Sequence, residues 1–159
     1  MVGALAFLAR GQAEGWTSMT VPMDYLHASR DFRRFLDAVK TQSMLATHNQ
    51  CYAMTRAVLH VFRSHISMKD ALEFAEILPP LLRVIFIEGW NLDAEITPFP
   101  DRQTLLAEVK AVRAPHNVAP ETAIGDIAAI LRAEVGEATL RRVLKSMPHG
   151  AEAYWLTKP

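Results

Sequence analysis

The sequence predicts an all-α protein in which two related four-helix units pack into one compact domain. Three observations predict this fold. Apolar residues recur with the spacing of a helix, capping residues and prolines divide the chain into short helices, and the second half repeats the pattern of the first. At 159 residues, half of them apolar, the chain has the length of one ordinary domain and can bury a sizeable core.

The start of the chain, residues 1–24, is predicted to be a flexible extension in front of a single helical domain at 25–159. Its apolar run at 2–9 has no preceding positive charge and is too short for a secretory core, so it does not predict a signal peptide. The most apolar stretch, 71–90, is interrupted by charged residues and two prolines. It therefore predicts a buried core rather than a membrane span.

The composition limits the classes of partner. Seventeen Lys and Arg residues balance seventeen Asp and Glu residues. A neutral chain lacks the long-range positive field that draws proteins to nucleic acid or to a membrane surface, so we expect neither partner. Cys51 is the only cysteine, which excludes an intramolecular disulfide and is typical of a protein of the reducing cytoplasm.

The first predicted helix starts at Ser29, a suitable N-cap, and the second spans about 48–64. Thr47 and Gln50 fit a capping box in front of the second helix, where each side chain satisfies a free backbone N–H. The apolar faces have helical spacing and comprise Phe32, Phe35, Leu36 and Val39 in the first helix and Cys51, Met54, Val58, Val61 and Phe62 in the second.

A third helix is predicted after Ser67, with Asp70 at its third position. Pro79 ends this helix because proline disfavours helical geometry in the residue before it. A fourth helix is predicted from the proline pair to about Gly89, a residue suited to the left-handed conformation. We expect the core to contain Leu78, Leu82, Ile85 and Phe86. Residues 91–100 carry two prolines and no helical period, so they are predicted to connect the two halves.

The second half repeats the first with an offset of 69 residues. The matched pairs include Val58 with Ile127, Phe62 with Leu131, Arg63 with Arg132, Phe74 with Val143, Leu78 with Met147, Pro79 with Pro148 and Phe86 with Trp155. Further upstream, with a shift of one residue, His48-Asn49 answers His116-Asn117. The agreement predicts units at about 29–90 and 101–157, joined by the connector 91–100 and packed together near Pro79.

The run 77–90, ILPPLLRVIFIEGW, is similar to the pattern of a family of small bacterial proteins known only as a domain of unknown function, number twenty-two sixty-seven. That pattern is Leu-Pro, then Leu-Arg, then an aromatic residue followed by Glu-Gly-Trp. The resemblance covers about 31–155. It implies a helical fold, and it implies no activity, cofactor or catalytic residue.

The second half departs from this pattern. Met147-Pro148 keeps the helix break, but the Leu pair and the Gly-Trp ending are missing. The segment Glu88-Gly89-Trp90 therefore belongs to one unit alone, which makes it a candidate interface. In the alternative interpretation, Gly89 ends a helix and Trp90 covers the core beside the connector.

Metal and nucleophile chemistry are not predicted. His60 and His65 lie five residues apart, which places them on different helix faces, and neither belongs to a metal-binding motif. Cys51 follows His48 and could be a nucleophile near a helix start, but it also begins an apolar stripe, where free cysteine behaves as a buried hydrophobe. The second interpretation is favoured because no third, orienting group is marked.

The charged clusters are interpreted as helix surfaces. Asp70, Glu73 and Glu76 could pair two carboxylates for hydrolysis or for a hard metal ion, but a solvated face with Lys69 as a partner is favoured. Two basic groups are predicted to be solvated faces as well, and they comprise Arg30, Arg33 and Arg34 in the first half and Arg141, Arg142 and Lys145 in the second.

We therefore expect a binding or assembly module rather than an enzyme, with no catalytic, cofactor-binding or metal-binding residue. A protein partner or self-association is the expected interaction, and Arg83, Glu88 and Trp90 are the candidate interface or pocket-rim residues. The alternative is a small-molecule or lipid-binding protein with an apolar pocket between the two units.

Overall fold

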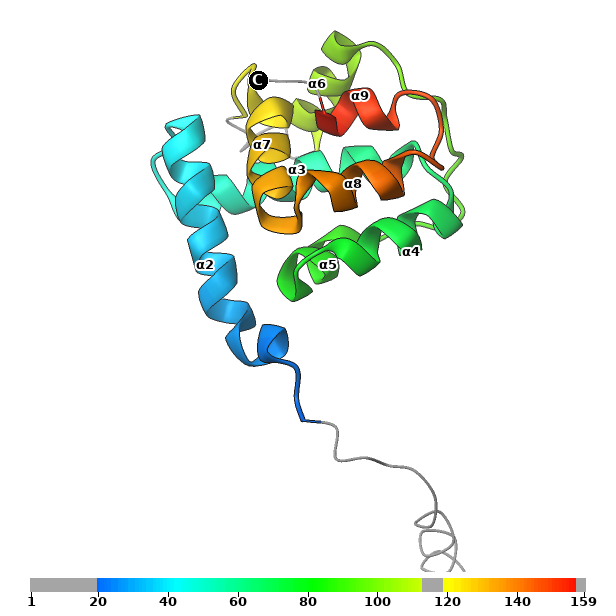
Figure 1. Ribbon diagram of the computed structural model, residues 1–159. Helices are drawn as coiled ribbons and strands as arrows, with labels where there is room; N and C mark the ends of the chain where they lie inside the picture. Colours follow the sequence, from blue (N-terminus) through cyan, green and yellow to red (C-terminus); the bar gives the residue numbers. More distant parts are fainter. Residues whose placement is uncertain (1–19, 113–118, 157–159) are drawn as a thin grey trace, which may run out of the picture.

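The computed structural model describes residues 20–112 and 119–156, and over these ranges it is all-helical, as predicted. Its helices, labelled as in Figure 1, are α2 (Met23–Ser43), α3 (His48–Ser64), α4 (Met68–Ile77), α5 (Pro80–Ile87), α6 (Arg102–Ala111), α7 (Ala123–Val135), α8 (Glu137–Leu144) and α9 (Ala151–Leu156). Residues 1–19 of the predicted extension, the His116-Asn117 pair and residue 157 lie outside the described ranges.

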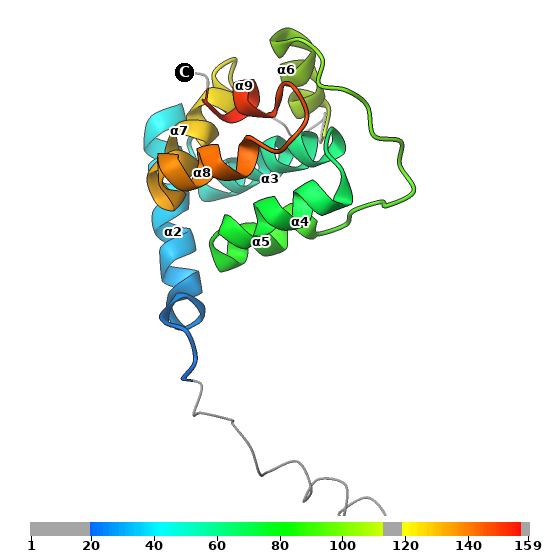
Figure 2. The same cartoon turned by 45° about the vertical axis from the view of Figure 1, so that its right-hand side comes forward.

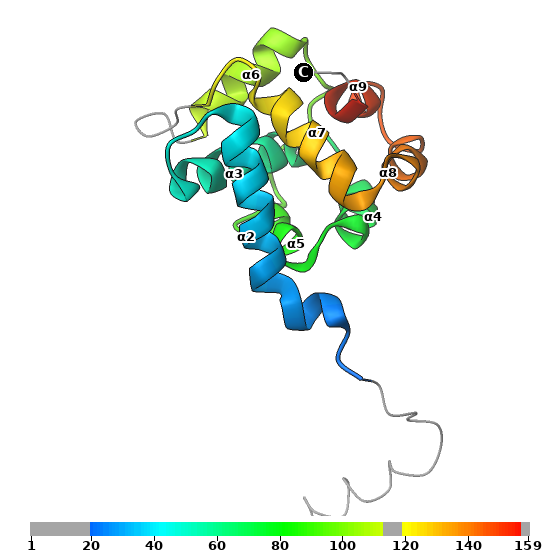
Figure 3. The same cartoon turned by 60° about the vertical axis from the view of Figure 1, so that its left-hand side comes forward.

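Helix α2 begins at Met23, so the predicted start at Ser29 is wrong. Pro22 occupies the N-cap position with a φ of −54°, and Asp24 in the first turn complements the helix dipole. Met23 and Asp24 therefore belong to α2 rather than to the predicted extension. The helix buries Phe35, Leu36 and Val39, whereas its N-terminal end projects beyond the other helices (Figures 1 and 3).

Helix α3 lies at the centre of the fold and packs against α2, α5, α6 and α7. Its predicted capping box is confirmed. The Thr47 hydroxyl accepts from the Gln50 N–H at 3.2 Å, and the Gln50 side-chain oxygen accepts from the Thr47 N–H at 3.1 Å. The predicted apolar stripe is buried at every position, namely Cys51, Met54, Val58, Val61 and Phe62.

The predicted break between the third and fourth helices is also confirmed. Ser67 caps α4 by accepting from the Asp70 N–H, and Leu78 leaves the helix with a ψ of 141° in front of the proline pair. After α5 the chain turns at Gly89, whose φ is +60°. The predicted core residues are buried, namely Leu78, Leu82, Ile85 and Phe86.

The connector between α5 and α6 contains no helix and runs around the side of the molecule (Figure 2). His65 at the end of α3 fastens it to the body. The Nδ1 atom of this buried ring lies 2.9 Å from the Thr97 carbonyl oxygen, and Nε2 lies 2.9 Å from a carboxylate oxygen of Glu108 on α6. Phe99 packs on the core beside the same ring, so the connector has a fixed course.

A cluster of aromatic rings joins α3, α4, α5, the connector and α9. The centroids of contacting rings lie 4.8–6.0 Å apart, and the cluster comprises Phe62, Phe74, Phe86, Phe99, Tyr154 and Trp155. The Tyr154 hydroxyl also donates to the Val58 carbonyl oxygen at 2.8 Å. These contacts place residues of both predicted units in one core.

Candidate functional site

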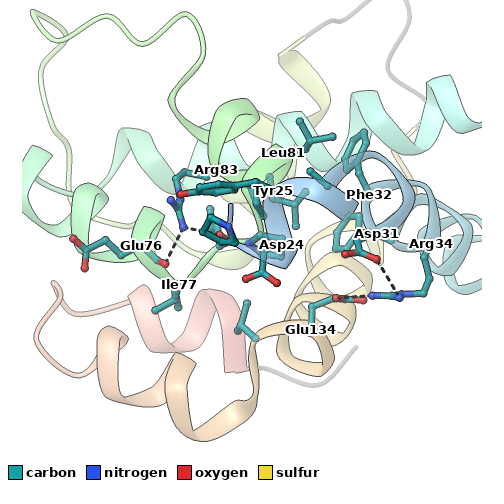
Figure 4. A pocket seen from close by; sticks show the side chains of 18 residues that line it. Asp24, Tyr25, Asp31, Phe32, Arg34, Glu76, Ile77, Leu81, Arg83 and Glu134 are labelled. Carbon is teal, nitrogen blue, oxygen red and sulfur yellow. Dashed lines mark hydrogen bonds and ion pairs between the residues drawn. The ribbon is translucent and has the colours of Figure 1, made fainter. Parts of the chain in front are cut away.

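A groove of about 460 Å³ lies between α2, the junction of α4 with α5, and the end of α7 (Figure 4). Helix α2 contributes residues between Pro22 and Phe35, the junction contributes 76–83, and α7 contributes Glu134 and Val135. The groove therefore opens at the Pro79 break, and its walls come from both halves of the chain.

The local sequence explains why a groove forms at this junction. Pro79 cannot donate a backbone hydrogen bond, so α4 ends and leaves carbonyl oxygens that no following turn can satisfy. Arg83 donates to three carbonyl oxygens at this junction, and one of them, that of Ala75, also accepts from the Leu78 N–H. Its Nε donates to the Ala75 oxygen at 2.8 Å, and its Nη2 donates to the oxygens of Glu76 and Leu78 at 3.1 and 3.2 Å. The guanidinium of this predicted rim residue thus joins α5 to the end of α4 and forms part of one wall of the groove.

The groove carries more negative than positive charge. Four carboxylates and two guanidiniums line it. Arg34 is paired, because it lies 3.3 Å from Asp31 and 3.9 Å from Glu134. Asp24 and Glu76 are exposed and have no ion-pair partner among the residues that the structure describes. Within the described part of the chain, each of these two carboxylates is thus open to a cationic group of a ligand.

The other two predicted rim residues, Glu88 and Trp90, lie at the opposite end of α5 and do not line the groove. Trp90 is half-buried and packs on the core, with the guanidinium carbon of Arg63 5.2 Å from its ring centroid. The Glu88 carboxylate lies 3.9 Å from Arg56. Arg83 is therefore separated from the Glu-Gly-Trp segment.

Buried Arg63 is the charged group around which this second cluster forms. Its Nη1 donates to the carbonyl oxygens of Phe86 and Glu88 at the end of α5. Burial, together with the nearby charge of Arg56, lowers the pKa of the Arg63 guanidinium to about 10. The two carbonyls and the Trp90 ring offset the cost of burying this cation.

The candidate nucleophile Cys51 is fully buried, and this burial raises the pKa of its thiol. The three histidines weighed as ligands or bases, His48, His60 and His65, have structural partners. His48 lies 2.7 Å from Asp37, and the Nε2 of His60 lies 2.7 Å from the Ile85 carbonyl oxygen. Within residues 20–112 and 119–156, no three His, Cys, Asp or Glu side chains come together as a metal site.

The charged helix surfaces also have local partners. Asp70 accepts from the Ser67 hydroxyl, and Glu73 pairs with Lys69 at 2.7 Å, as the solvated-face interpretation predicts. Glu76, the last residue of that row, lines one end of the groove, and its exposed carboxylate lies apart from that of Asp24 (Figure 4). In the part of the chain that the structure describes, no helix is long and apolar enough to cross a membrane.

Sequence reasoning missed the α2 wall of the groove because it placed the start of that helix too late. Tyr25, Ala28 and Phe32 recur at i, i+3 and i+7, which continues the apolar spacing of α2 towards its N-terminus. This signal could have identified the wall. The carboxylate of Glu134 on α7 carries no comparable local signal.

Comparison with family models gives one identification. A model described as "Uncharacterized conserved protein (DUF2267)" matches residues 32–154, which include all of α3 to α8. A comparison with curated proteins gave no match. The matched segment covers most of the chain, and it includes the Leu-Pro break and the Glu-Gly-Trp ending. The chain therefore belongs to the DUF2267 family.

Proposed function

We propose that this protein is a binding or assembly module that receives a segment of a protein partner in the groove between α2, α4–α5 and α7. One observation carries the proposal. Asp24 and Glu76, which have no ion-pair partner within residues 20–112 and 119–156, line the groove together with half-buried apolar side chains, among them Phe32, Ile77 and Leu81. Apolar surface with a charged rim is the usual composition of a surface that binds another protein.

A site for a lipid or a small apolar molecule is the second candidate, since the groove has the volume of many ligand pockets. Its lining favours a protein partner instead. Six of its eighteen lining residues are charged, and an acyl chain would remove water from these charges without pairing them.

The lining also favours binding over catalysis. Among the described residues that line the groove there is no Ser, Thr, Cys, His or Lys, so no nucleophile stands beside a histidine or lysine base. We accordingly place the protein among non-enzymatic modules. We also place it in the cytoplasm, because a single buried cysteine suits a reducing compartment.

We further infer that the two halves are related four-helix units. Arg63 on α3 donates to the carbonyl oxygen of Phe86, and Arg132 on α7 donates to that of Trp155 at 3.0 Å. The two arginines are 69 residues apart in the sequence, and so are the two residues whose carbonyl oxygens accept. The same helix-to-helix hydrogen bond at equivalent positions supports the repeat.

Photo-crosslinking in cells tests the binding function. A benzophenone amino acid at position 25 lies in the groove, and the same group at position 44 provides the control, because Met44 is 88% exposed at the far end of α2. We expect discrete protein adducts from position 25 and none of the same mass from position 44. If position 25 forms no adduct and native mass spectrometry finds a co-purified small molecule, the second candidate replaces the first.

A further inference from the structure

We infer that the partner segment is a basic amphipathic helix, whose apolar side chains fill the groove and whose Lys or Arg side chains reach Asp24 and Glu76. This inference rests on the proposed function and adds the chemical class of the partner.

The charges of the groove select a cationic partner. Arg34 is occupied by Asp31 and Glu134, and Arg83 by the carbonyl oxygens at the end of α4. Neither guanidinium is available to neutralise Asp24 on α2 or Glu76 on α4. Two cationic side chains of a partner, one at each carboxylate, would each gain a charge-assisted contact, whereas an acidic segment would meet repulsion from both.

The shape of the groove selects a helix. It follows α2 from Pro22 to Phe35, a length of roughly 20 Å at the rise of an α-helix, which a helix of about 14 residues matches. The groove volume suits the apolar side chains of one face rather than a whole helix. Tyr25 lies alongside Arg83 at the mouth and offers an aromatic rim (Figure 4).

The apolar surface continues beyond the groove at the projecting end of α2. Val21, Met23, Tyr25 and Leu26 are each 56–62% exposed, so a segment that leaves the groove here would meet further apolar side chains. A small cation would use the carboxylates and leave this surface uncovered. The combination of two carboxylates, an elongated groove and an apolar helix end thus favours an amphipathic segment over a free cation.

Two synthetic helical peptides of about 14 residues test the inference, one with Leu at positions a, d and e of each heptad and Lys elsewhere, the other with Glu replacing Lys. Binding of the fluorescein-labelled peptides to the full chain is measured by anisotropy at two salt concentrations. We expect the Lys peptide to bind and to weaken in higher salt, and the Glu peptide not to bind.

Matched double variants locate the site. Asp24→Lys with Glu76→Lys is expected to weaken binding of the Lys peptide by at least about tenfold, because both cation contacts become repulsive. Asp93→Lys with Glu95→Lys is the control. It makes the same change in net charge at exposed positions of the connector, and it is expected to leave binding within about twofold. Circular dichroism melts of both double variants verify that they are folded.

Several results would overturn the inference. Equal weakening by the two double variants would mean that the peptide responds to net charge. Equal competition by spermine, a cation without an apolar face, would mean that the carboxylates bind charge alone. If the Lys peptide fails to bind while position 25 still crosslinks to a protein, the binding function stands and the partner is of another class. If both experiments fail, the proposed function fails with the inference.

Discussion

The guanidinium carbon of Arg63 lies 5.2 Å from the centroid of the Trp90 ring, and the same guanidinium donates to the carbonyl oxygens of Phe86 and Glu88. Arg63 is at the end of α3, Phe86 is in α5, and Trp90 lies just before the connector 91–100. One buried cation therefore joins α3 to α5 and to the residue that follows Gly89. This arrangement favours a stabilising role for Trp90.

Replacing Trp90 with Ala is expected to lower the free energy of unfolding by about 2 kcal/mol, since the half-buried ring loses its core contacts and its contact with the Arg63 cation. Urea unfolding followed by circular dichroism measures this loss. Leu92→Ala is the control, because Leu92 is 63% exposed in the same connector. An unchanged midpoint with altered self-association, measured by light scattering, would instead assign Trp90 to an interface.

Replacing Arg63 with Lys is expected to cost about 2 kcal/mol, because a single ammonium cannot stack on Trp90 and donate to both carbonyl oxygens at once. A double-mutant cycle with Trp90→Ala is expected to show a coupling of about 0.5–1 kcal/mol. The Arg33→Lys variant, at an exposed position of α2, should unfold like the original chain. Additive effects of the Arg63 and Trp90 changes would show that the two side chains act independently.

Signals that act on the adjacent backbone predicted several helix ends correctly. Thr47, Ser67 and Pro79 each determine a boundary through hydrogen bonds or dihedral angles of their own neighbours. The start of α2, in contrast, was predicted at the wrong residue. Ser29 is the better capping side chain, but Pro22 starts the helix through its restricted φ, without any side-chain hydrogen bond.

The groove could not be predicted because its walls are distant in the sequence. Asp24, Glu76 and Glu134 come from three helices, and no local pattern relates them. The contact of His65 with Glu108 was unpredictable for the same reason. Arg83 was predicted to be an interface or rim residue because it belongs to the motif that resembles the family pattern. Its hydrogen bonds to the end of α4 depend on the turn that the chain makes at Pro79, which the motif does not reveal.

The stability of the protein is expected to fall in mild acid because of His60. Burial lowers the pKa of this ring from 6.5 to about 4, while its hydrogen bond to the Ile85 oxygen opposes the shift. Between these two values the unfolded chain binds a proton that the folded chain does not, so stability is lost as the pH falls. The expected loss from this residue between pH 7.5 and pH 5 is about 2 kcal/mol.

Urea unfolding of the original chain and of His60→Gln at the two pH values measures this contribution. The Gln amide can still donate to the Ile85 oxygen but does not titrate, so the variant should lose about 2 kcal/mol less than the original chain. Equal losses in the two chains would show that other groups cause the pH dependence.

Two glycines with positive φ offer a comparison of backbone strain with steric fit. At Gly89, φ is +60° and an added Cβ would meet no atom within 4 Å, so Gly89→Ala should cost about 1 kcal/mol for the left-handed conformation alone.

At Gly150, φ is +106° and an added Cβ would lie 2.6 Å from the Cβ of Phe99. Phe99 is packed against Phe62 and Tyr154 and cannot move freely. Gly150→Ala should therefore cost about 3 kcal/mol or more, measured by urea unfolding, because strain and overpacking add. Equal costs at the two positions would mean that Phe99 adjusts readily, and that the connector is held less firmly than its contacts with His65 and the aromatic cluster indicate.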